Sequence, residues 1–136
     1  MNNGENEPLA RARVPGELYR LSAGGAALAV GLVVVSAVLE LGTTHWGLAL
    51  VALPLLVANA VVARLAYPQL FGRAVGAVAL FLVAIALGGV VAWSGEAAWA
   101  GVLHVGAGGA ALAASLVLVA AALRGTPLAL ARARAW

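Results

Sequence analysis

The 136-residue chain contains no cysteine and few charged residues. Without cysteine it can form no disulfide, no thiolate zinc site and no iron–sulfur cluster. Only 10% of its residues are charged, whereas soluble domains average about 25%, and 64% are hydrophobic, whereas soluble domains average about 45–50%. So little polar surface cannot cover a globule, which excludes an ordinary soluble fold and leaves no room for a separate soluble domain.

The chain also lacks the sequence motifs of several enzyme classes. It contains no GxxxxGK(S/T), no HExxH and no GxSxG, so nothing indicates nucleotide, zinc-protease or serine-hydrolase chemistry. Its net charge of +3 includes eight basic residues, all of them arginines that flank apolar runs. Arginines placed in this way are typical of membrane topology, so we expect no nucleic-acid partner.

Four apolar runs follow one another along the chain, each close to the ~20 residues that cross a bilayer. They span residues 21–41, 45–63, 74–93 and 97–123. The first run is longer than the about 7–15 apolar residues of a signal peptide and no clear cleavage site follows it, so we interpret it as a helix of the mature protein. The sequence predicts an all-α integral membrane protein, with a four-helix transmembrane bundle over 21–124, flexible tails at 1–20 and 125–136, and a loop at 64–73.

The arginines indicate how this bundle is oriented. All eight lie on one side of four antiparallel spans, and the two opposite loops contain none. By the positive-inside rule both termini are then cytoplasmic, and we expect the cell (plasma) membrane of a prokaryotic cell as the location. Trp46, Trp93 and Trp99 lie at the opposite boundary, where an aromatic belt is expected.

The chain divides into two similar helical hairpins, each with a glutamate near its turn. The second helix of the first hairpin reads HWGLALVALPLLVANAVVAR, and its counterpart reads HVGAGGAALAASLVLVAAALR. Both begin with His-x-Gly and end in Arg, so the two hairpins share one orientation in the membrane. This arrangement predicts that His45 and His104, the only two histidines, lie at the same depth in the bundle.

Two histidines at one depth favour haem over other metal groups. Zinc usually takes four ligands, and the chain has no cysteine or aspartate. Glu40 and Glu96 could complete a set of two histidines and two glutamates, but they lie at different offsets, five and eight residues before their histidines. Haem needs only two axial ligands, which facing helices of a bundle can supply. Gly47, Gly106 and Gly108 follow the histidines and would let a flat macrocycle approach the backbone. Two simpler interpretations stay open, namely polar histidines at the membrane interface and glycines that serve helix packing.

The remaining polar residues of the runs are few. Glu40, at the end of a span, is the candidate catalytic residue, for proton handling or for orienting a ligand histidine, whereas Glu96 in the Ser-Gly-Glu turn is more simply a solvated charge. For Ser36, Asn59 and Ser115, in the middle of the helices, we expect interhelical hydrogen bonds.

The segment AIALGGVVAWSGEAAWAGVLHVGAGGAALAASLVLVAAALR, residues 84–124, resembles the haem A synthase family. It has the family's Gly-Gly helix end, Ser-Gly turn and following helix that opens with His, and the first hairpin fits this scheme more loosely. Haem A synthases have eight helices in two similar halves, so residues 21–124 resemble a four-helix, half-length form. The resemblance implies that His45 and His104 are axial ligands to the iron of haem b.

The same resemblance implies a reaction and its partners. The family oxidises the methyl group of haem O to the formyl group of haem A, and terminal (cytochrome) oxidases receive the product. Implied partners are the lipid bilayer, haem, a second copy in a homodimer, haem O synthase and a terminal oxidase. The residues leave alternatives open: a non-catalytic small membrane subunit or oxidase assembly factor, or, less favoured, a transporter with Glu40 and the histidines as a proton path.

Overall fold

The structure, a computed structural model, describes residues 16–39, 42–95 and 98–124. Every regular element in these residues is an α-helix: α1 Gly16–Val38, α2 Gly42–Ala66, α3 Pro68–Ser94 and α4 Ala98–Leu123. All four helices are long and apolar enough to cross a membrane. The prediction of an all-α chain with four membrane-length helices is therefore confirmed for the described residues.

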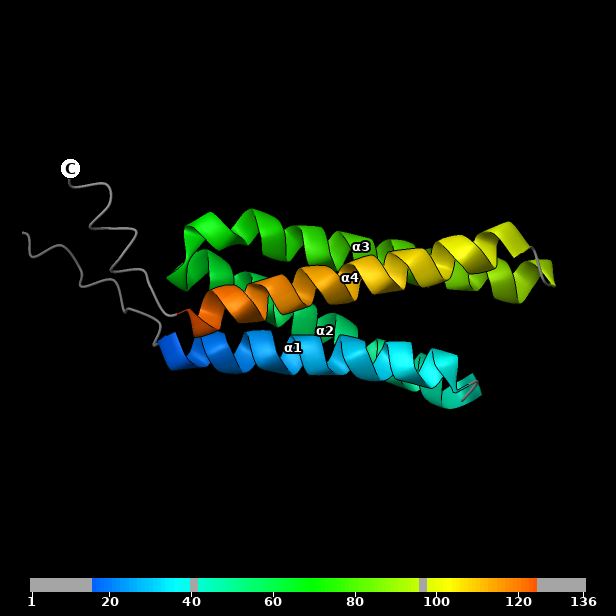
Figure 1. The fold of residues 1–136 in the computed structure, drawn as a ribbon, viewed down its shortest axis with the longest axis horizontal. Coiled ribbons are helices and arrows are strands. Elements are labelled where there is room, and N and C mark those ends of the chain that lie inside the picture. The colour runs from blue at the N-terminus through cyan, green and yellow to red at the C-terminus, as the bar shows by residue number, and fades with distance from the viewer. Residues whose placement is uncertain (1–15, 40–41, 96–97, 125–136) are drawn as a thin grey trace, which may run out of the picture.

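The four helices form an antiparallel ring. α1 packs on α2, α2 on α3, α3 on α4, and α4 closes the ring on α1, so that α2 and α4 lie diagonally. Figure 1 shows the helices running along one long axis. We call α1 with α2 the first hairpin and α3 with α4 the second hairpin, which correspond to the two halves of the sequence repeat.

The helix boundaries differ from the expected ones. α1 begins at Gly16, within the predicted tail, and the predicted loop over 64–73 is wrong, because only Tyr67 separates α2 from α3. Apolar run length sets where a chain leaves the bilayer, not where its helix ends. Pro68 explains the sharp break, since it fits the first position of α3 and disfavours helical conformation at the residue before it. The predicted turn after α3 is confirmed by Gly95, whose φ of 58° is left-handed.

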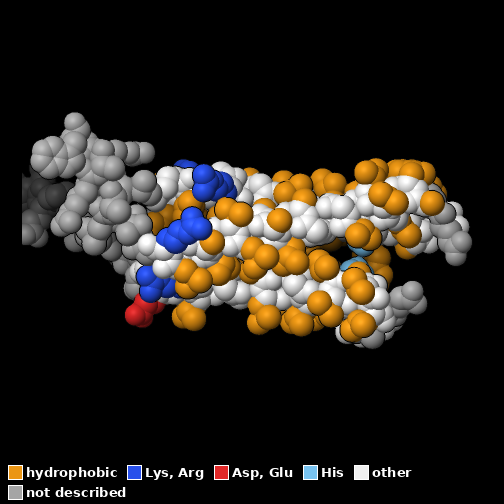
Figure 2. All heavy atoms as spheres, viewed as in Figure 1, with side chains coloured by type: hydrophobic (Ala, Val, Ile, Leu, Met, Phe, Trp, Pro, Cys, Tyr) orange, Lys and Arg blue, Asp and Glu red, His pale blue; other side chains and the backbone are white. Residues whose placement is uncertain are grey.

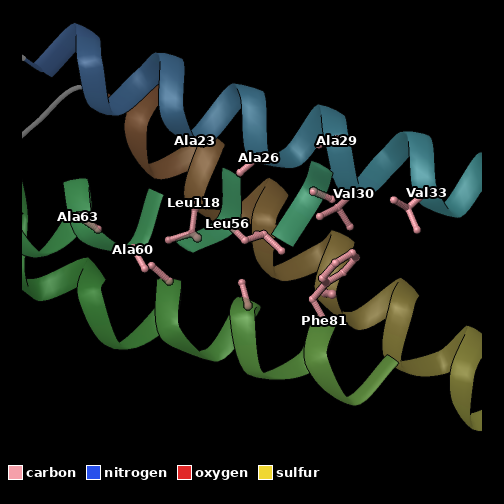
Figure 3. Close-up of a cluster of buried hydrophobic side chains, with 14 of the residues drawn as sticks. Ala23, Ala26, Ala29, Val30, Val33, Leu56, Ala60, Ala63, Phe81 and Leu118 are labelled. Atoms are coloured by element: carbon pink, nitrogen blue, oxygen red, sulfur yellow. The ribbon is translucent and has the colours of Figure 1, made fainter. Parts of the chain in front are cut away.

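Small side chains build most of the core between the helices. Alanine at a helix contact lets two backbones approach closely, which is how helices associate in the absence of water. Larger side chains such as Leu56, Phe81 and Leu118 fill the remaining space (Figure 3). The core alanines with at most 1% exposed surface are Ala23, Ala26, Ala52, Ala63, Ala74, Ala77, Ala100 and Ala111.

The two ends of the bundle differ in the residues they carry. Arg20, Arg64, Arg73 and Arg124 stand at or near the ends of antiparallel helices that meet on one side, which we call the arginine end (Figure 2). Here Arg20 Nε donates to the Ala122 carbonyl oxygen at 3.2 Å and joins α1 to α4.

The opposite end, which carries both histidines, is called the histidine end. In Figure 1 the two hairpins separate toward this end, α1 and α2 on one side and α3 and α4 on the other. Trp46, Trp93 and Trp99 are exposed here, in the positions that the aromatic belt predicts. The two hairpins thus diverge toward the histidine end.

Candidate functional site

A pair of histidines lies across the diagonal of the bundle. His45 stands in the first turn of α2 and His104 in the second turn of α4, and both are half-buried. Their ring centroids are 5.8 Å apart and their planes are inclined by 81°. The sequence repeat predicts equal depth for these two residues, and the structure brings their rings together.

The backbone of α3 holds the His104 ring. His104 Nδ1 lies 2.7 Å from the Ala84 carbonyl oxygen. Because a carbonyl only accepts hydrogen bonds, Nδ1 carries the proton and donates it. The ring packs on Gly88, one turn further along α3, where a Cβ atom would stand only 3.0 Å from His104 Cε1. Glycine at this position therefore lets the ring lie against the helix.

The His45 ring is held by α1 in a similar way. His45 Nδ1 lies 3.1 Å from the Val33 carbonyl oxygen and 3.1 Å from Ser36 Oγ. The Ser36 hydroxyl donates its proton to the same Val33 oxygen at 2.8 Å. Its oxygen is then free to accept from Nδ1, so the serine and the carbonyl share the His45 proton.

The two rings consequently adopt the same tautomer. With the proton on Nδ1, the neutral ring keeps a lone pair on Nε2. No hydrogen bond within the described residues occupies Nε2 of His45 or His104. A histidine whose Nδ1 donates to a carbonyl is oriented as metal-binding histidines usually are. Each hairpin therefore holds one imidazole ready to act as a ligand through Nε2.

An apolar cavity of about 140 Å³ adjoins the histidine pair. All four helices line it, and apart from the two imidazoles and the Trp46 indole its lining residues are hydrocarbon or glycine. Figure 2 shows the hollow between α1 and α4, with histidine side chains visible inside it. The lining residues are Val33, Val34, Ala37, Val38, His45, Trp46, Ala49, Phe81, Ala84, Ile85, His104, Val105 and Gly108.

The geometry of the pair suits a group with two axial positions. Two imidazoles that bind one metal through Nε2 have centroids roughly 6 Å apart, because each metal–nitrogen bond is about 2.0–2.1 Å. The observed spacing of 5.8 Å is close to this value. No cluster of three or more His, Cys, Asp or Glu side chains exists in the described residues to hold a bare ion. Haem iron, which its macrocycle already holds equatorially, needs only the two histidines.

The cavity also sets a limit on size. Pockets for whole ligands measure about 300–1,000 Å³, whereas this cavity measures about 140 Å³. A macrocycle would therefore have to extend beyond the cavity, along the hollow between α1 and α4 (Figure 2).

The structure separates the three candidate glycines. Gly108 lines the cavity, whereas Gly47 and Gly106 are exposed and do not line it. The candidate catalytic residue Glu40 and the turn residue Glu96 lie outside the described residues. The only acidic side chain within them is Glu17, which stands in the first turn of α1 at the arginine end.

The mid-helix polar residues behave in two ways. Ser36 bonds across to His45, and Asn59 Oδ1 accepts from Ser22 Oγ at 3.0 Å, so the predicted interhelical bonds are confirmed for these two. The prediction for Ser115 is wrong, because its hydroxyl donates to the Ala111 carbonyl of its own helix at 2.8 Å. A serine inside a helix readily reaches the carbonyl four residues back.

Two residues of the site were not predicted from the sequence. Gly88 was part of the Gly-Gly signature of the resemblance, but nothing in the sequence assigned it to the His104 ring. Ala84 contributes only its backbone oxygen, and no side-chain pattern reveals such a contact.

Comparison with known proteins found no matching family model, no matching characterised protein and no matching solved structure.

Proposed function

We propose that the chain is an integral membrane protein that binds haem between His45 and His104, in the manner of a half-length haem A synthase. One observation carries the proposal. Two imidazoles from diagonal helices lie with their ring centroids 5.8 Å apart beside an apolar cavity, and each has its Nδ1 hydrogen-bonded, which leaves the Nε2 lone pair for a ligand bond.

The chain's own residues would bind and orient this group. The Val33 and Ala84 carbonyls fix the two rings, and the hydrogen bonds that they accept raise the basicity of the ligand nitrogens. Phe81, which is 2% exposed, lines the cavity at the level where the core begins. The hydrocarbon walls exclude water from the ring faces. Bound haem b would supply electron transfer at this position.

The proposal includes an orientation in the membrane. It has the arginine end in the cytoplasm with both termini, and the histidine end toward the outer face of a prokaryotic plasma membrane. The gathering of four arginines at one end and of exposed tryptophans at the other supports this orientation.

The reaction proposed from the resemblance is oxidation of the haem O methyl group to the formyl group of haem A. Glu40 is the proposed proton-handling residue, and a second copy of the chain would hold the second haem in a homodimer. The alternative is a non-catalytic small membrane subunit or oxidase assembly factor.

Visible spectroscopy of the detergent-purified protein tests haem binding. We expect a Soret band that shifts on reduction. Each chain should bind about one haem, because its bundle offers two histidine ligands. His45→Ala and His104→Ala should each lower haem affinity by more than about 100-fold. Ser115→Ala, which removes a buried hydroxyl of α4 away from the pair, is the matched control and should keep the spectrum. If the purified protein contains no haem and takes up none on reconstitution, the proposal is wrong.

A second experiment separates enzyme from binding protein. The chain is coexpressed with a source of haem O, and the haems are extracted and separated by chromatography. Haem A in the extract, lost in a Glu40→Gln variant that still binds haem, would establish catalysis. Haem b alone would establish the non-catalytic alternative.

A further inference from the structure

The cavity at the histidine pair opens sideways between α1 and α4. Val38 of α1 and Val105 of α4 both line the cavity and are also 76% and 68% exposed, so they form its rim. Figure 2 shows the hollow between these two helices. Because both helices are of membrane length and apolar, an opening between them faces sideways, toward the lipid that would surround the bundle.

The hydrogen bonds near the cavity run within the hairpins and not between them. His45 of α2 bonds to α1, and His104 of α4 bonds to α3. The one described side-chain hydrogen bond that joins the two hairpins is that of Arg20 to the Ala122 carbonyl, at the arginine end. Separation of the hairpins at the histidine end would therefore break none of the described side-chain hydrogen bonds.

The chain connection between the two hairpins also lies at the arginine end. The short link at Tyr67 joins the first hairpin to the second, and it lies at the arginine end. Beyond this link, the hairpins meet at the histidine end only through side-chain packing. The two hairpins are thus connected at the arginine end, and at the histidine end no described side-chain hydrogen bond prevents them from moving apart. The cavity at the histidine end is too small for a whole macrocycle.

We propose that the gap between α1 and α4 is a lateral portal, through which a flat macrocycle of the haem class, apolar except for its two propionates, passes from the lipid phase to the histidine pair. The hairpins widen at the histidine end to admit it, and each delivers its imidazole from one side. This inference rests on the proposed haem binding and adds the route and the lipid-borne class of ligand.

The absence of cysteine from the chain allows a direct test by cross-linking. Val38→Cys with Val105→Cys places one thiol on each rim of the portal, to be bridged by a cleavable bis-maleimide in lipid nanodiscs. Haem b is added, and growth of the Soret band gives the uptake rate. We expect bridging to slow uptake by at least ~10-fold, because the gap can no longer widen, and cleavage of the linker to restore the rate.

The matched control is the same bridge at the arginine end. Leu21→Cys with Leu123→Cys joins exposed positions of α1 and α4 beside the Arg20–Ala122 bond, and it should leave the rate within about twofold, since that end is already fastened. Each single-cysteine variant treated with the reagent measures the effect of the chemical modification alone, and bridging the rim should slow uptake well beyond that effect. These controls separate bridging from the chemical modification itself.

A bulky side chain gives an independent measurement. Ala37→Trp narrows the cavity from α1 and should slow uptake, whereas Ala58→Trp on the exposed face of α2 should not. If the rim-bridged protein takes up haem as fast as the unbridged one, the portal is overturned while haem binding stands. If no variant and not even the parent chain takes up haem, the proposed function fails and the portal falls with it.

Discussion

The arginine end and the histidine end are built from the same four helices but pack differently. At the arginine end, fully buried alanines such as Ala63 and Ala74 bring the backbones together, and Arg20 bonds across from one hairpin to the other. At the histidine end, two imidazoles stand between the hairpins and every described side-chain hydrogen bond stays within a hairpin. The contrast teaches that side-chain size and the direction of a few hydrogen bonds decide where a bundle is closed and where it can hold a ligand.

Removal of a large side chain should affect the closed part most. Leu118, 1% exposed on α4 toward the arginine end, is surrounded by core residues, so Leu118→Ala should lower the free energy of unfolding by about 2–5 kcal/mol. Ile85→Ala should lower the free energy of unfolding clearly less, because Ile85 lines the existing cavity and its removal only enlarges that cavity. Unfolding in mixed detergent micelles measures both, and equal losses would contradict the difference between the ends.

Added side-chain volume should also destabilise the arginine end more than the histidine end. Ala63 has no exposed surface, so Ala63→Leu forces two helices apart and should cost about 1–3 kcal/mol of unfolding free energy. Ala37 lines the cavity, so Ala37→Leu should fit with little loss of stability while it reduces haem binding. A thermal unfolding series with haem titration measures both effects, and a large loss of stability in Ala37→Leu would show that the cavity has no spare room.

The contact of His104 with α3 offers a sharper test. Gly88→Ala places a methyl group 3.0 Å from His104 Cε1, and the displaced ring should bind haem about 10–100-fold more weakly. Gly89→Ala is the neighbouring control, since nothing lies within 4 Å of its Cβ position. Haem titration followed at the Soret band compares the two. Equal affinities would mean that the ring does not need this position for binding.

A smaller effect is expected from the buried phenol at the arginine end. Tyr19 is 1% exposed, and its hydroxyl is the buried side-chain group without a hydrogen-bond partner among the described residues. Tyr19→Phe removes that group and should raise the free energy of unfolding by about 1 kcal/mol. The half-buried ring of Tyr67 packs on Tyr19, with 4.8 Å between the two ring centroids. Tyr67→Phe should change the free energy of unfolding less. A loss of stability in Tyr19→Phe would indicate that the hydroxyl has a partner in the native protein.

Much of the fold could be predicted from the sequence because hydropathy is a local property. Four runs of membrane length require helices, since no other open structure satisfies its backbone in lipid. The matched His-x-Gly starts predicted that His45 and His104 share one depth. The helix ends were less predictable, because the sharp break at Tyr67 depends on the fixed dihedral angle of Pro68 and not on hydropathy.

The contacts that orient the histidines could not be predicted in the same way. Ser36 was expected to bond between helices, but its partner depends on the rotation of α1 about its axis. The Val33 and Ala84 oxygens belong to backbone that every residue has, so no residue type marks them. The role of Gly88 depends on how closely α4 approaches α3.

The sequence by itself determined the all-helical class, the four helices of membrane length, the end at which the arginines lie and the identity of the two candidate ligands. These follow from composition, run length and spacing, which need no knowledge of how the helices meet. Only the tertiary structure decided that the rings lie 5.8 Å apart with Nδ1 bonded, and that the bundle opens at their end. Those facts depend on the packing of helices distant in the chain, where an added methyl group or a rotated helix changes the outcome.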